Sequence, residues 1–285
     1  MTGSASTLAA LVAGLKSGGI RVVDLTQPLH ATSPILQLPP EFGQTWKFEL
    51  QEISNFDSRG PMWYWNNFKT GEHTGTHFDA PGHWVSGKDY PNNLTDTIPP
   101  VKFIAPACVI DCVKETEKNP DFLLGPGHVK AWEKVHGRIP KGAWVLMRTD
   151  WALKRTRPDE YINAQADGCH SPGPHPELVP FLIKERDVIG FGNETVGTDA
   201  GQSFTFDPPF PCHSGMHGAN KYGLAGLIHL DRLPPAGAIV IAAPLKIVRG
   251  SGSPCRVIAL VPGKQAKSGK RKVKTKKKNQ SKRTR

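Results

Sequence analysis

Residues 71–84, which read GEHTGTHFDAPGHW, carry three histidines and one aspartate within eleven positions, namely His73, His77, Asp79 and His83. The glycine, proline and β-branched threonine residues between them disfavour a helix. In an extended chain the side chains alternate between two faces, so His73, His77 and Asp79 are expected to point to the same side. His83 keeps that parity unless the intervening Pro-Gly turn breaks it. The spacing therefore predicts imidazoles gathered around one carboxylate.

Two neutral imidazoles and a carboxylate form a ligand set that Mn²⁺, Zn²⁺ and Fe²⁺ accept, with coordination positions left for water. Such an ion lowers the pKa of water from about 15.7 toward 7 and polarises a carbonyl group. We therefore expect His73, His77 and Asp79 to be metal ligands. His83 follows closely, and its expected task is to take a proton from the water and return it to the leaving group. The predicted chemistry is metal-assisted hydrolysis.

A competing interpretation is the facial triad of non-haem Fe(II) oxygenases, which also uses two histidines and one carboxylate. His77-Phe-Asp79 fits the H-x-D half of that pattern, and Arg249-Gly-Ser251 resembles its distal R-x-S. The oxygenase pattern takes its second histidine from far downstream, however, whereas His73 already stands beside the first. A third histidine also has no task in that mechanism. Hydrolysis is the favoured interpretation.

The net charge of the chain is concentrated at its end. The formal charge is +11, but residues 264–285 carry twelve Lys or Arg and no acidic residue, which leaves −1 for residues 1–263. This basic tail offers almost nothing to bury and is expected to be disordered. Nucleic acid and anionic surfaces are its candidate partners, although no aromatic residues interleave the charges as base stacking prefers. A solubilising segment is the simpler interpretation.

Five cysteines, an odd number without a C-x-x-C pair, indicate free thiols in a reducing compartment: Cys108, Cys112, Cys169, Cys212 and Cys255. No apolar run approaches the eighteen residues that a transmembrane helix needs. We therefore expect a cytoplasmic protein without a transmembrane segment.

The chain is expected to contain three segments: a helical lead-in at 1–19, one domain at 20–262 and the disordered basic tail at 263–285. Strand candidates are rich in β-branched residues and cover 20–29, 61–69, 102–113, 143–149, 187–193, 237–247 and 255–261. Helical patterns cover 128–137, 175–186 and 214–225. Because strands outnumber helices and do not alternate with them, the pattern predicts a mixed α/β domain with a barrel-like sheet.

The stretch HTGTHFDAPGH at 73–83 resembles the H-x-G-T-H-x-D-x-P-x-H signature of the cyclase family of metal-dependent hydrolases, which includes bacterial kynurenine formamidase and isatin hydrolase. Similar segments at 21–30, 196–201 and 243–260 extend the resemblance over most of residues 20–262. It implies metal ligands at His73, His77 and Asp79, with His83 as the catalytic acid/base. It also implies a compact, swivelling β/β/α domain with peripheral helices, assembled as a homodimer or larger oligomer.

The sequence departs from the formamidase pattern at one position. Formamidase-like members build a second metal position from a downstream His and a Glu twelve residues later; His213 fits the first, but residue 225 is Ala. The resemblance therefore favours one divalent ion per chain, as in isatin hydrolase with Mn²⁺, with Zn²⁺ as the alternative. His213 is then a candidate for hydrogen bonding to substrate, with His217 as an alternative for the same task.

Aromatic residues near the motif indicate the substrate class. If the strand carrying Trp63 and Trp65 continues in register into the motif, both side chains face the metal and form a flat apolar wall for a small aromatic substrate. The resemblance is closest to the isatin hydrolase branch. The sequence thus predicts an amidohydrolase that opens an isatin-like cyclic amide, with an arylformamidase acting on N-formylkynurenine, or a related lactone or cyclic amide hydrolase, as the alternative.

Overall fold

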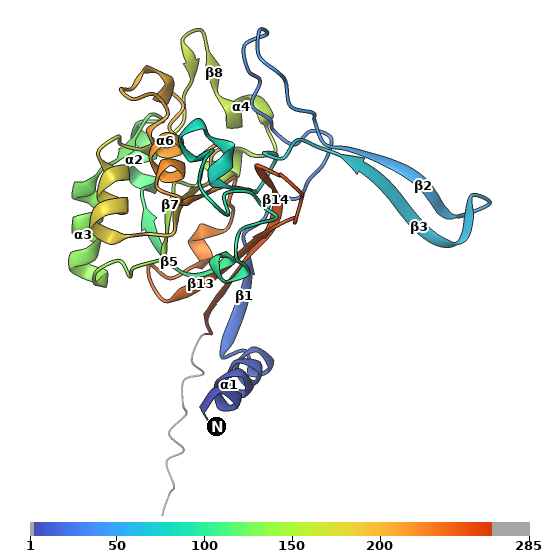
Figure 1. The fold of residues 1–285 in the computed structure, drawn as a ribbon, viewed down its shortest axis with the longest axis horizontal. Coiled ribbons are helices and arrows are strands. Elements are labelled where there is room, and N and C mark those ends of the chain that lie inside the picture. Colours follow the sequence, from blue (N-terminus) through green and yellow to red (C-terminus); the bar gives the residue numbers. More distant parts are fainter. Residues whose placement is uncertain (1–2, 264–285) are drawn as a thin grey trace, which may run out of the picture. The chain divides into compact units, whose positions relative to one another are not determined.

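A closed mixed β-sheet forms the centre of the fold, which is given by a computed structural model describing residues 3–263 (Figure 1). The strands follow one another in the order β1-β14-β13-β5-β7-β11-β12-β4, and a further pairing of β14 with β4 closes the sheet. Their bounds are β1 Ile20–Asp24, β4 His77–Asp79, β5 Ile104–Asp111, β7 Trp144–Arg148, β11 Gly190–Asn193, β12 Tyr222–Ala225, β13 Ala238–Pro244 and β14 Gly252–Pro262. Four neighbouring strands, β5, β7, β11 and β12, are parallel, and the pairings that involve β4, β13 and β14 with one another and with β5 and β12 are antiparallel. The predicted barrel-like mixed sheet is confirmed.

Alternating side chains of the central strands fill two separate cores. On β7, Trp144 and Leu146 belong to the core inside the closed sheet, whereas Val145 and Met147 belong to the core under the helices. Strand β5 alternates in the same way. Both faces of these strands are buried, which explains why they read as continuous apolar runs rather than as an alternation of apolar and polar residues.

Helices cover the outer face of the parallel part of the sheet, where α2 and α3 lie beside β5 and β7 (Figure 1). Their bounds are α2 Val113–Lys118, α3 Pro126–His136, α5 Leu178–Phe181 and α6 Pro211–Gly218, while α4 Pro158–Ile162 follows a turn after β7. The core under the helices contains a buried side chain from each of α3, α5 and α6, namely Val129, Leu178 and Met216. Helix α3 ends where Gly137 adopts a φ of 87°, a positive value that glycine tolerates because it has no Cβ atom. Helices are therefore peripheral, as predicted.

Three two-stranded sheets lie outside the barrel: β2 Glu49–Asp57 with β3 Gly60–Lys69, β6 Leu123–Leu124 with β10 Gly173–Pro174, and β8 Ala164–Gln165 with β9 Gly168–Cys169. The β2–β3 hairpin is the longest and extends away from the barrel as an arm (Figure 1). Apolar side chains on this arm are exposed, with Met62 at 83% of its full exposure. The arm therefore has a surface that the described residues of its own chain leave uncovered.

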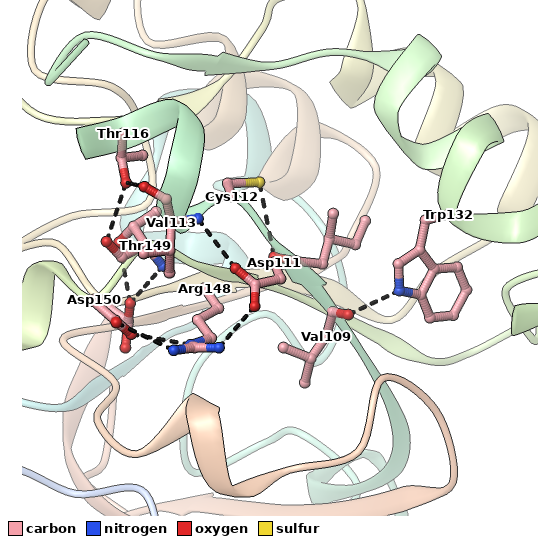
Figure 2. A network of polar contacts seen from close by, with 11 residues as sticks. Val109, Asp111, Cys112, Val113, Thr116, Trp132, Arg148, Thr149 and Asp150 are labelled. Carbon is pink, nitrogen blue, oxygen red and sulfur yellow. Dashed lines mark hydrogen bonds and ion pairs between the residues drawn. The ribbon is translucent and has the colours of Figure 1, made fainter. Parts of the chain in front are cut away.

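A polar network fixes the chain where β5 and β7 end (Figure 2). The guanidinium group of Arg148 donates to Asp111 at 2.7 Å and to Asp150 at 3.0 Å. The hydroxyl of Thr116 on α2 donates to the carbonyl oxygen of Thr149 at 3.1 Å. These contacts attach α2 and both strand ends to one another, at the carboxyl edge of the parallel strands.

Most of the predicted elements occur where the sequence placed them, with two corrections. The helical pattern at 214–225 is half wrong, because α6 ends at Gly218 and Tyr222–Ala225 is strand β12. This segment pairs with β11 on one side and β4 on the other, and those backbone hydrogen bonds outweigh its local preference. The extended run predicted from His73 to Asp79 is also wrong for its first half, since only His77–Asp79 is a strand and Gly75 has a φ of 63°.

The division of the chain into three segments stays a prediction. Helix α1 spans Gly3–Ser17, and Arg21–Pro262 forms one compact unit. The basic segment at 264–285 lies outside the described residues. Within the described part of the chain, no helix has the length and apolar character needed to cross a bilayer. All five cysteines lie in that part and are free, as predicted.

Candidate metal centre

Strand β4 places Asp79 between two glycines of neighbouring strands. In the pairing of β4 with β12, Asp79 stands opposite Gly223, and in the pairing with β14 it stands opposite Gly252. A Cβ atom on Gly223 would lie 2.5 Å from Asp79 Oδ2, and one on Gly252 would lie 2.5 Å from Cε1 of His73. Only glycine leaves room at these positions for the buried carboxylate and the imidazole.

His73 and His77 both approach Asp79, although they arrive by different routes. His77 lies on β4, whereas His73 lies in the turn before it. His73 Nδ1 is 2.8 Å from Asp79 Oδ1, and His77 Nε2 is 3.4 Å from the same oxygen. The structure therefore brings the three predicted ligands together, although not through a continuous extended chain.

The donor atoms of these residues fit a cation. His77 donates Nδ1–H to the carbonyl oxygen of Gly75 at 2.9 Å, so in the neutral ring Nε2 carries a lone pair facing the Asp79 carboxylate. Burial lowers the pKa of His77, which favours this neutral form. Asp79 Oδ2 is buried and has no hydrogen-bond partner among the described residues. Lone pairs that converge without a donor between them are what a divalent ion binds.

Asp79 is ionised despite its burial. Removal from water would raise its pKa, but the imidazoles of His77 and His73 beside it and the hydrogen bond that His73 donates hold the pKa well below its usual range. An ionised carboxylate at the centre of the cluster is the form that binds a metal ion.

His83 contacts the same cluster from a short 3₁₀ turn, Pro81–His83, that follows β4. Its ring stacks on that of His73 with centroids 3.8 Å apart. Burial and the neighbouring charge of His73 lower the pKa of His83 to about 2. The ring is thus neutral at neutral pH.

Helix α6 brings two further histidines to the other side of Asp79. His213 Nε2 lies 4.0 Å from Asp79 Oδ2, and its Nδ1 is 2.5 Å from Asp199 Oδ2. Burial alone would lower the pKa of His213, but the hydrogen bond and charge of Asp199 outweigh it and raise the pKa. For His217, burial and the charge of His213 lower the pKa to about 4. Sequence reasoning placed His213 correctly beside the cluster, and it did not connect Asp199 to it.

Two sets of donor atoms converge closely enough to hold a metal ion among the described residues. One consists of His73, Asp79 and His83, and the other of Asp79, His213 and His217; within each set the atoms lie within 4.8 Å of one another. His77 belongs to neither set, although it lies beside Asp79. Ala225, which stands opposite His77 on β12, is fully buried and supplies no ligand.

The aromatic wall beside the cluster differs from the expected one. Trp63 and Trp65 lie on β3 of the arm with 48% and 54% of their surface exposed, and their strand ends at Lys69, before the motif. Trp84, which directly follows His83, packs on His213 with ring centroids 4.7 Å apart and on Phe210 at 5.6 Å. The continuous register that the sequence argument required for Trp63 and Trp65 is absent.

Two other polar groups near strand ends are occupied by partners of their own. Glu194 accepts hydrogen bonds from the backbone N–H of Thr149 at 2.6 Å and from its hydroxyl at 3.1 Å. Lys221 pairs with Asp187 at 2.6 Å. By contrast, Glu72 and Ser251 extend the cluster beyond His73, through contacts that the sequence did not indicate.

This chain is similar to known proteins over most of its length. The family model described as a putative cyclase matches residues 23–200. An isatin hydrolase from Roseibium aggregatum is 51% identical over 258 residues, covering 90% of this chain and 98% of that protein. The crystal structure of an isatin hydrolase bound to the product analogue thioisatinate has a TM-score of 0.90 and 50% identity, covering 92% of this chain and 100% of that chain. A kynurenine formamidase from Salinibacter ruber is more distant, with 25% identity over 238 residues, 83% of this chain and 96% of that protein.

The match to the family model spans the strand that carries Asp79, the 3₁₀ turn that carries His83 and the segment that ends beside Asp199. The signature at 73–83 therefore lies within the residues that the family model matches. This chain belongs to the cyclase family.

Proposed function

We propose that this chain is a metal-dependent hydrolase that opens the ring of a small aromatic cyclic amide of the isatin type. The observation that carries the proposal is the Asp79 cluster, in which three predicted ligands and a neutral His83 meet in one place. The 51% identity to an isatin hydrolase over most of the chain supports the substrate class.

His73, His77 and Asp79 are the residues that would hold the ion. We propose one divalent ion per chain, with Mn²⁺ favoured and Zn²⁺ as the alternative, because imidazole and carboxylate ligands suit both. When bound, the ion would lower the pKa of the attacking water and polarise the amide carbonyl.

His83 moves the proton of the reaction. Its neutral imidazole takes a proton from the attacking water as the new carbon–oxygen bond forms, and returns that proton to the ring nitrogen as the carbon–nitrogen bond breaks. The product is an open-chain amino acid, so water is added across the amide and no oxidant or reductant is needed.

Substrate is held by groups on the α6 side of the cluster. Trp84 and Phe210, whose rings meet edge to face, offer an apolar wall for a bicyclic ring, and His213 hydrogen-bonds a polar atom of the substrate. Trp63 and Trp65 remain substrate-contact candidates only if a second copy of the chain brings its arm to the site.

N-formylkynurenine is the second candidate substrate, because the chain also matches kynurenine formamidases. The carboxylate of the formamidase pattern is missing at Ala225, and the identity to formamidases is far lower. The cyclic amide is therefore preferred.

We further infer a cytoplasmic homodimer. The five free cysteines support a reducing compartment. The exposed apolar side chains of the β2–β3 arm support self-association, because a patch of this kind is costly to leave in water. Light scattering of the full chain tests the dimer. Binding of DNA and anionic vesicles to the full chain, compared with a chain ending at Gly263, tests whether the basic tail has such partners.

The deciding experiment is metal analysis together with turnover of isatin and N-formylkynurenine by protein reconstituted with Mn²⁺ or Zn²⁺. One ion per chain with isatin turnover is the expected result. Two ions with formamide turnover would replace the proposal by the formamidase alternative, and full turnover without metal would end both.

A further inference from the structure

The ring nitrogen of His73 that faces away from Asp79 has partners of its own. His73 Nε2 lies 3.1 Å from the hydroxyl oxygen of Ser251, which precedes β14. That hydroxyl lies 2.5 Å from Glu72 Oε2, and the backbone N–H of Ser251 donates to the same oxygen at 3.2 Å. The three side chains form a relay, Glu72–Ser251–His73, whose last member reaches the metal cluster.

The direction of each hydrogen bond in this relay follows from chemistry. The Ser251 hydroxyl donates its single proton to Glu72 Oε2, the oxygen that also accepts from the Ser251 backbone N–H. The hydroxyl oxygen then has only lone pairs to offer His73. His73 therefore donates Nε2–H to Ser251.

The consequence lies at the other ring nitrogen. Without an ion, Nδ1 donates to Asp79 Oδ1 at 2.8 Å, and an incoming ion would take the place of that proton. The one N–H that a neutral imidazole keeps is then on Nε2, where Ser251 accepts it, and the Nδ1 lone pair is free for the ion. A histidine that binds a metal through one ring nitrogen commonly donates the N–H of the other to such a partner, which fixes the tautomer and the ring orientation. We propose that Glu72 and Ser251 are positioning residues that prepare His73 Nδ1 to bind the divalent ion; this rests on the ligand role of His73 in the proposed function.

The loop that carries Ser251 is built against the metal-binding motif. The backbone N–H of Ala80, directly after Asp79, donates to the carbonyl oxygen of Ser251 at 2.9 Å. Gly252 lies so close to the His73 ring that a Cβ atom would collide with Cε1 at 2.5 Å. Ser251 thus stands in the R-G-S stretch that resembled an oxygenase pattern, but its contacts give it a different task.

The relay is tested by measuring Mn²⁺ affinity of the metal-free, full-length protein, for example by electron paramagnetic resonance of the free ion. Ser251→Ala and Glu72→Ala should each weaken Mn²⁺ binding by about 10- to 100-fold, the range found for such partners of metal ligands. Ser251→Thr keeps the hydroxyl and should restore most of the affinity. Because the two residues act in series, the double variant should be little worse than either single variant.

Asp96→Ala provides the matched control. Asp96 accepts a hydrogen bond from the backbone N–H of Arg249 at 3.2 Å, so it supports the same loop without touching His73. Its Mn²⁺ affinity should equal that of the original protein. Unchanged affinity in Ser251→Ala and Glu72→Ala would overturn the proposal, and so would an equal loss in Asp96→Ala, which would reveal a general effect of loop distortion.

The readout is independent of the substrate. Loss of Mn²⁺ affinity in the relay variants supports the relay even if the protein does not turn over isatin. If the original protein turns over isatin but the relay variants keep their Mn²⁺ affinity, only the proposed function is supported.

Discussion

The imidazole rings of His73 and His83 stack in direct contact, with centroids 3.8 Å apart and planes inclined by 29°. A predicted metal ligand and the proposed proton carrier thus share one face. Because donor atoms of His83, His73 and Asp79 also converge, the geometry alone allows His83 to act as a ligand or as a base. The two roles differ in what the loss of His83 does to metal content.

Replacing His83 by alanine should leave one ion bound and remove turnover. Loss of a general acid/base costs about 10²- to 10⁴-fold in rate. Metal analysis and isatin hydrolysis on the same preparation measure both quantities. A metal-free His83→Ala protein would make His83 a ligand instead.

Replacing His77 by alanine should remove both the ion and the turnover. His77 Nε2 faces Asp79 and has no other task in the site. Metal analysis after dialysis measures the loss. A fully active, metal-free His77→Ala protein would contradict the entire metal mechanism.

Replacing His213 by alanine should leave the metal content unchanged and reduce kcat/KM for isatin by about tenfold, because a hydrogen bond to substrate is worth on the order of 1 kcal/mol. His136→Ala, an exposed histidine on α3, is the control and should have no effect. If His213→Ala loses metal, His213 is a ligand.

Replacing Gly223 by alanine should disturb the site from the neighbouring strand. The added methyl group would lie 2.5 Å from Asp79 Oδ2 and 3.1 Å from Thr198 Cγ2. We expect weaker Mn²⁺ binding and a loss of about 1–3 kcal/mol in the free energy of unfolding, as for other overpacked sites. Metal titration and urea unfolding measure these effects.

Gly127→Ala is the control for this substitution, because the added methyl group on α3 meets no atom within 4 Å apart from its chain neighbours and the backbone of its own helix. It should leave metal binding unchanged and stability equal or slightly higher. Equal metal affinity in both glycine variants would show that Asp79 tolerates the added methyl group.

Stability should depend on pH through Glu194. Burial raises its pKa from 4.5 to about 7, although the hydrogen bonds from Thr149 lower it in part. Between these values the unfolded chain releases a proton that the folded chain keeps, so rising pH favours unfolding. The contribution of Glu194 to stability is complete below pH 4.5 and is lost as the pH rises through 7.

Glu194→Gln removes this dependence, because glutamine does not titrate. Its free energy of unfolding relative to the original protein should rise between about pH 4.5 and 8 by up to about 3 kcal/mol. Urea unfolding across that range measures the difference. Glu117→Gln, at an exposed position on α2, should show no such trend, and a flat difference for Glu194→Gln would contradict the prediction.

The sequence by itself determined the chemistry of the centre. The spacing of His73, His77, Asp79 and His83 predicted a metal cluster with a proton carrier, and the structure gathers all four side chains. The strands with both faces buried could also be predicted from the sequence, because each contains a run of β-branched and aliphatic residues. Local residue types carry this information directly.

Only the tertiary structure decided which distant residues support the cluster. Asp199 reaches His213, and Ser251 reaches His73 across 178 positions, through strand pairings that no local pattern encodes. The strand at Tyr222–Ala225 likewise depends on its neighbours, since β11 and β4 supply its hydrogen bonds. Trp84 rather than Trp63 stands beside the site because the chain turns at 70–76 instead of continuing as a strand. These relationships arise from closure of the sheet, which brings β4, β12 and β14 together, and closure is a property of the whole chain.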